Sequence, residues 1–170
     1  MNARNSDLKI VIAHEDLMTG IEAAVMLGRM GAQLEAEFEM KGETWWFDSG
    51  FWQFEALRDP ELLEQAAAEA AAADIIIISV GGAELPACVR NWIECALPMK
   101  EGGSPALLAL LDRGNDASGA PPRSESYLRR LAGRCGLDFV YNNGDRLPGV
   151  ESGVESILSR SEGGLETWRS

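Results

Sequence analysis

The sequence predicts an α/β fold with a parallel sheet, and three observations lead to that prediction. Short apolar, β-branched segments alternate with segments of helical spacing, at intervals of about 30 residues, as in successive βαβ units. Several helical segments begin at a capping residue and end at glycine. The chain has 170 residues, which suits one domain and is too short for two comfortable ones.

The first strand is predicted at residues 8–13, which are apolar as in a strand covered on both faces. A helix follows, because residues 19–22 have the Thr-x-x-Glu form of a capping box and Gly31 is a plausible end. The second strand is predicted at residues 35–41, where charged and apolar residues alternate. Its row of charges is typical of a protected sheet edge.

The next helix is predicted to begin at Asp59, a capping residue that is followed by proline. The third strand is predicted at residues 75–80, and the helix after it begins near Pro86. The fourth strand is predicted at residues 106–111.

Beyond the fourth strand, Ser124 is predicted to cap a helix that closes at Gly136. The fifth strand is predicted at residues 137–141, and a short last helix from Ser152. Five strands in βαβ units fit the flavodoxin-like order 2-1-3-4-5, a three-layer α/β/α sandwich. We expect one domain at residues 1–146, with residues 147–170 as its C-terminal extension.

Charge excludes some partners and is unevenly spread. With 27 acidic and 15 basic residues the net charge is −12, which disfavours nucleic acid and anionic membranes. Residues 35–74 have a net charge of −9 and residues 113–146 a net charge of +2, so we expect one acidic and one mildly basic edge. No apolar run suits a signal peptide or a membrane span, and we expect a cytoplasmic protein.

A ligand site is expected where the carboxyl ends of the first and third strands adjoin. The expected pocket-lining residues are Thr19, Gly81, Gly82, Glu84 and Arg113. Arginines in the loop before the fourth helix could bind a carboxylate or phosphate, or be ordinary surface residues.

The first of these loops contains Glu15 and Asp16, which would repel a phosphate group. The pair could hold Mg²⁺, or Asp16 could cap the helix. No metal site is predicted beyond this weak candidate, since the chain has one histidine. No catalytic triad or paired catalytic carboxylates can be assembled from the residues present.

Two partial resemblances follow from these segments. The paired acids resemble those of bacterial receiver domains, but the chain has Ser79 and Val80 where a receiver has its phosphoacceptor aspartate. Residues 73–78 and 85–94 resemble the third strand and following helix of NADPH-dependent FMN reductases and quinone reductases. That resemblance implies a flavodoxin-like fold, with residues 81–85 facing a flavin ring.

Six aromatic residues gather within ten positions, too many to stay in water without a large loss of burial energy. They could form a lid, an interface or a stacking surface for a planar ligand. The lid or interface candidates are Trp45, Trp46, Phe51 and Trp52.

We therefore expect a domain that acts by binding or protein–protein interaction, without evident catalytic machinery and with no cofactor. A homo-oligomer or a protein partner would use the aromatic, acidic edge. The alternative is an FMN-dependent NAD(P)H reductase with an atypical flavin site.

Overall fold

The computed structural model describes residues 5–39, 44–81, 84–97, 106–111 and 123–142. Strands and helices alternate along the chain as predicted. The strands are β1 (Asn5–His14), β2 (Thr44–Gln53), β3 (Ile75–Val80), β4 (Ala106–Leu111) and β5 (Asp138–Asn142). The helices are α1 (Leu17–Glu39), η1 (Phe54–Arg58), α2 (Pro60–Ala71), α3 (Ala87–Ala96) and α4 (Arg123–Cys135).

The strands form one sheet in the order β2-β1-β3-β4-β5, and every pair of neighbours is parallel. The predicted α/β class with a parallel sheet is confirmed. β1 has a partner on both sides, with Ile12 opposite Phe51 of β2 and Ile77 of β3. β3 is buried along its whole length, as the unbroken isoleucine run predicts.

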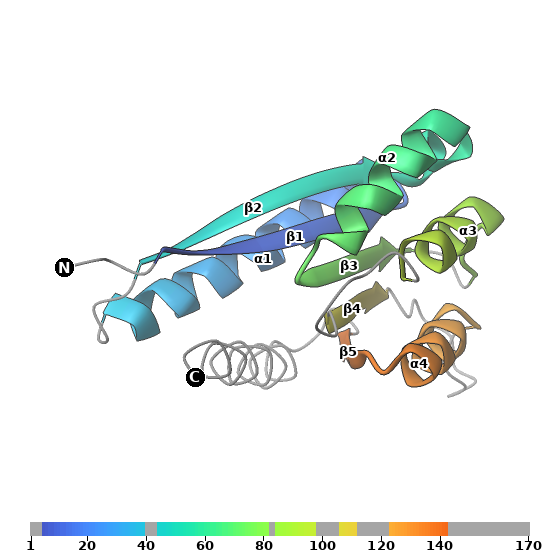
Figure 1. The fold of residues 1–170 in the computed structure, drawn as a ribbon. Coiled ribbons are helices and arrows are strands. Elements are labelled where there is room, and N and C mark those ends of the chain that lie inside the picture. The colour runs from blue at the N-terminus through green and yellow to red at the C-terminus, as the bar shows by residue number, and fades with distance from the viewer. Residues whose placement is uncertain (1–4, 40–43, 82–83, 98–105, 112–122, 143–170) are drawn as a thin grey trace, which may run out of the picture.

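Helices cover both faces of the sheet, which gives three layers (Figure 1). On one face, Ala23 and Met26 of α1 contact Ile10, Ile12 and Ile77. The other face carries the larger core, which η1, α2, α3 and α4 cover. No helix within the described ranges is both long and apolar enough to cross a membrane.

The predicted position of the second strand is wrong. Residues 35–39 continue α1, which runs through Gly31, and β2 begins at Thr44. Ala, Leu and Glu are strong helix formers, and this preference outweighs both the alternating pattern and one interior glycine. Trp, Phe and Thr favour strands, so the aromatic segment forms the edge strand.

The predicted helix ends are partly correct. Asp59 caps α2, because its carboxylate accepts from the backbone N–H of Glu61 at 2.9 Å. Gly136 has a φ of +68°, the left-handed conformation that ends α4. Ser124 is not the cap, since α4 begins at Arg123 and the Ser124 hydroxyl is buried. The predicted helix from Ser152 and the extension 147–170 lie outside the described residues.

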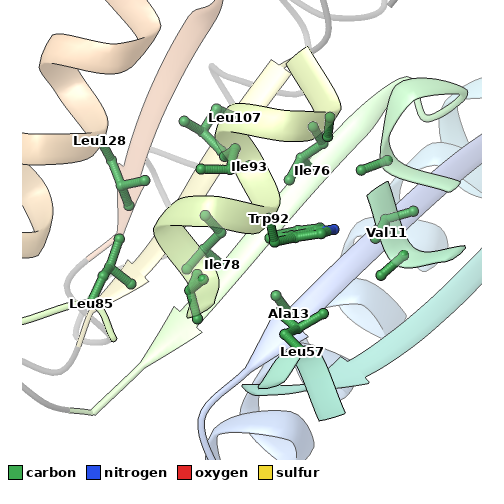
Figure 2. Close-up of a cluster of buried hydrophobic side chains, with 14 of the residues drawn as sticks. Val11, Ala13, Leu57, Ile76, Ile78, Leu85, Trp92, Ile93, Leu107 and Leu128 are labelled. Carbon is green, nitrogen blue, oxygen red and sulfur yellow. The ribbon is translucent and has the colours of Figure 1, made fainter. Parts of the chain in front are cut away.

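Trp92 is the largest fully buried side chain of the described core. It extends from α3 toward Val11 of β1 in Figure 2, between the layers of α3 and the sheet. Its indole Nε1 has no hydrogen-bond partner. A buried donor without a partner is destabilising, so this ring stabilises the core by its apolar surface alone.

Candidate functional site

The carboxyl ends of β1 and β3 adjoin, as expected of the site in this topology. His14 lies opposite Ser79, and the backbone N–H of Glu15 donates to the carbonyl of Ser79 at 3.1 Å. The buried Ser79 hydroxyl donates to the carbonyl of Thr19 at 2.9 Å. The N–H of Gly81 donates to the Glu15 carboxylate at 2.7 Å. Hydrogen bonds therefore bridge the predicted crevice between the two loops.

Asp16 caps α1, which confirms one of the two alternatives for this acid, and the predicted cap at Thr19 is wrong. The N–H of Thr19 donates to the Asp16 carboxylate at 2.9 Å, and the N–H of Asp16 donates to the Thr19 hydroxyl at 2.9 Å. This reciprocal pair satisfies amides at the start of the helix. The Thr19 N–H is the main group that lowers the pKa of the Asp16 carboxyl. Gly20 fits here because a Cβ would lie 2.9 Å from His14 Nδ1.

These contacts leave little room for an anion at the first loop. The amides of Thr19 and Gly81, which a phosphate would need, already donate to carboxylates of the chain. Glu15 and Asp16 each serve a structural hydrogen bond, and no cluster of three metal-ligating side chains occurs among the described residues. Gly82 and Arg113, the other predicted pocket residues, lie outside the described residues.

A cavity of about 380 Å³ lies further along the same edge, between the segment after β3 and the start of α4. Of the predicted pocket residues it includes Glu84, whose carboxylate pairs with Arg123 at 2.6 Å. Arg90 of α3 and Arg130 of α4 also line it. The spacing of Arg123, Tyr127 and Arg130 on one helix face was the signal that sequence reasoning missed.

Tyr127 links α4 to α3 beside this cavity. Its hydroxyl donates to the Glu94 carboxylate at 2.6 Å. Desolvation, together with this hydrogen bond, raises the pKa of Tyr127 to about 12. The neutral phenol is thus the form that this hydrogen bond between α4 and α3 favours.

The outward face of α1 is a second candidate site. Leu17, Met18, Ile21 and Val25 are 73%, 64%, 47% and 50% exposed. Spacings of three and four residues place them on one side of the helix, opposite the buried Ala23 and Met26. We call these four residues the α1 outer face. The sequence signal was present, since large apolar residues lie on two opposite sides of this helix in its first turns.

The predicted aromatic interface is only partly described. Phe51 is 45% exposed and lies on the α1 side of the sheet, because it is in register with Ile12. Its ring is 6.3 Å from that of His14. Trp52 is half-buried, and its Nε1 donates to the Glu69 carboxylate of α2 at 2.8 Å. The side chains of Trp45 and Trp46 lie outside the described residues.

No protein-family model matches the sequence, and the search of curated proteins finds no match. Three solved structures are similar over most of the chain. A homoserine dehydrogenase from S. aureus is 13% identical with a TM-score of 0.49 over 82% of this chain, which spans 33% of that enzyme. A flavodoxin-like domain from Synechococcus sp. is 12% identical with a TM-score of 0.43, covering 87% and 92% of the two chains.

The third, a CMP N-glycosidase from Clostridium botulinum, is 15% identical with a TM-score of 0.36, covering 79% of this chain and 88% of the enzyme. Such identities and TM-scores say nothing about activity or ligand. The flavodoxin-like description rests on the parallel sheet and its strand order.

Proposed function

We propose that this protein acts by protein–protein interaction and that the α1 outer face is its docking surface. The observation that carries the proposal is the exposure of four large apolar side chains side by side on one helix. Monomeric soluble proteins seldom leave such a continuous apolar surface in water. Phe51 extends this surface, since it contacts His14, and His14 lies against Gly20 of α1.

A second copy of the chain is the partner that α1 fits best. Glu22 and Arg29 are exposed and lie seven residues apart at the border of the α1 outer face. In an antiparallel pair of α1 helices, Glu22 of one copy would lie opposite Arg29 of the other. Gly28 has no atom within 4 Å of the place of a Cβ, so a partner helix can approach closely there. An apolar centre with paired charges at its border is the usual arrangement of a protein–protein interface.

The net charge gives this association a recognisable salt dependence. Two copies at −12 each repel one another, whereas apolar burial is not weakened by salt. Added salt should therefore strengthen the dimer. Binding to nucleic acid would show the opposite trend, because counterion release weakens it as salt rises.

The alternative function, an FMN-dependent reductase, has less support from the geometry. The β1–α1 loop does not fit a phosphate group, because Asp16 and Glu15 occupy the amides that would bind it. The resemblance of residues 85–94 to the reductases and a cytoplasmic location stay predictions. A purified protein that is yellow, with an absorbance band near 450 nm, would overturn this part of the proposal.

The test is the mass of the protein in solution, measured by analytical ultracentrifugation over a range of concentrations. We expect a dimer for the wild type and a monomer for Val25→Glu. Each copy buries the exposed half of Val25, about 1 kcal/mol, so the loss in both copies weakens the dimer by about 30-fold before charge repulsion is counted. Ala68→Glu places the same charge on an exposed site of α2 and should leave the dimer intact.

A charge exchange tests the geometry of the pair. Glu22→Arg alone should weaken the dimer, and the double variant Glu22→Arg with Arg29→Glu should restore it. Far-UV circular dichroism confirms that each variant is folded. A wild type that is monomeric at every concentration, or a dimer that Val25→Glu leaves unchanged, contradicts the proposal.

A further inference from the structure

The cavity at the start of α4 has an excess of positive charge. Arg90, Arg123 and Arg130 line it together with one acid, Glu84. Glu84 is paired with Arg123 at 2.6 Å, whereas Arg90 and Arg130 form no ion pair with any described residue. Two guanidinium groups without an ion-pair partner among the described residues thus border one concave space, and the Glu94 carboxylate lies beside it on the Tyr127 hydroxyl.

Ser124 provides an independent observation that points to a ligand. It lines the same cavity, it is 1% exposed, and its Oγ has no hydrogen-bond partner. Nearly all buried hydroxyls in folded proteins have such a partner, so an orphan at the wall of a cavity indicates a missing acceptor. Ser124 also lies in the first turn of a 13-residue helix, whose N-terminal amides and dipole favour an anion.

We propose that this cavity binds a small phosphate-bearing molecule, with Arg90, Arg130 and the Ser124 hydroxyl as donors to the phosphate. Arginine presents a planar fork of N–H groups that matches phosphate oxygens. Three arginines and one glutamate line the cavity, so even with Glu94 beside it the positive charge is in excess, which favours an anion. A volume of about 380 Å³ is within the range of small-molecule sites and leaves room for more than the phosphate group itself.

Glu84 allows the direction of a change in phosphate affinity to be predicted. The Arg123–Glu84 pair is exposed, with side chains that are 84% and 62% accessible, so it costs little to break. A phosphate in the cavity would be repelled by Glu84 and attracted by Arg123. Glu84→Gln removes the repulsion and frees the arginine, so it should tighten phosphate binding several-fold.

The test is isothermal titration calorimetry with inorganic phosphate, at constant ionic strength and near neutral pH. We expect saturable binding at one site per chain, and weaker binding of acetate, a monoanion. Arg130→Gln and Arg90→Gln should each weaken phosphate binding about 10-fold or more, the effect of losing one charge-assisted hydrogen bond. Arg58→Gln, which removes a charge from an exposed site of η1 that does not line the cavity, is the matched control and should change binding less than two-fold.

Ser124→Ala separates a binding role from a structural one. If the hydroxyl awaits a ligand, the alanine variant should bind phosphate more weakly and yet unfold at the same or a higher urea concentration in phosphate-free buffer. In ¹H–¹⁵N spectra, phosphate should shift the amides of Ser124 and Tyr127 and leave those of Ile21 and Val25 unchanged.

Three results would overturn the proposal. The first is no binding at tens of millimolar phosphate. The second is an equal loss of binding in Arg58→Gln and Arg130→Gln, which would indicate non-specific attraction. The third is acetate binding as tightly as phosphate, which would assign the cavity to carboxylates.

Discussion

For two tryptophans of the core, the more deeply buried one should be the less costly to replace by phenylalanine. Trp92 is fully buried and its Nε1 has no partner, whereas Trp52 is half-buried and its Nε1 donates to Glu69. Substitution by phenylalanine keeps an aromatic ring at each site and removes the N–H. We expect Trp92→Phe to be tolerated better than Trp52→Phe, although Trp92 is the more deeply buried.

The magnitudes follow from the contacts. Trp92→Phe gives up about 40 Å² of ring surface, worth about 1 kcal/mol, plus a small cavity term. Removing the N–H also removes the penalty of burying a donor without a partner, about 1–3 kcal/mol. The free energy of unfolding should therefore stay within about 1 kcal/mol of wild type. Trp52→Phe loses a hydrogen bond to a carboxylate, about 1 kcal/mol at this accessible site, with no such gain. Trp92→Ala should cost about 3–5 kcal/mol.

Urea unfolding followed by far-UV circular dichroism measures these differences, since the fluorescence of five tryptophans would change with each substitution. A Trp92→Phe variant that loses more stability than Trp52→Phe would refute the reasoning, as would a loss of more than about 2 kcal/mol in Trp92→Phe. It would mean that the indole N–H has a partner in solution, such as a buried water.

Two further outcomes are expected from the helices. Asp59→Ala should lower the free energy of unfolding by about 1 kcal/mol through loss of the α2 cap, with Asp59→Asn largely retaining it, as urea midpoints would show. The raised pKa of Tyr127 means that the native state keeps a proton which the unfolded state releases above pH 10. Stability should therefore fall between about pH 10 and 12, and Tyr127→Phe should lack this part of the pH dependence; an identical profile in both proteins would contradict it.

The parallel α/β class was predictable because β3 and β4 are short continuous apolar runs that alternate with helical segments, which is typical of a sheet covered on both faces. The start of α2 was predictable because Asp59 and Pro60 are local signals that no distant contact changes. The second strand was misplaced because the apolar residues of 35–39 fit both the period of a strand and that of a helix. The position of the true strand depends on pairing between the aromatic segment and β1, which the local sequence does not show.

The candidate site was harder to predict, since it depends on contacts between distant segments. The expected pocket at Thr19 and Gly81 is bridged by Glu15, a contact over 66 residues that spacing does not show. Arg90 and Arg130 belong to different helices, and only the fold brings them to one cavity. Ser124 was interpreted as a cap because its position suits one, whereas its burial is a tertiary effect.

The lengths of β1 and β2 have a consequence for how the native state opens. Each strand has ten residues, and β3 is paired with β1 only from Ile10 onward. Lys9 is still hydrogen-bonded to Asp74 just before β3, so residues 5–8 and 44–47 form a two-stranded ribbon that projects beyond the rest of the sheet (Figure 1). A ribbon supported on one side separates at a small fraction of the global unfolding free energy. Its amide hydrogens should thus exchange with solvent while β3 stays protected, so the protein opens in two cooperative units.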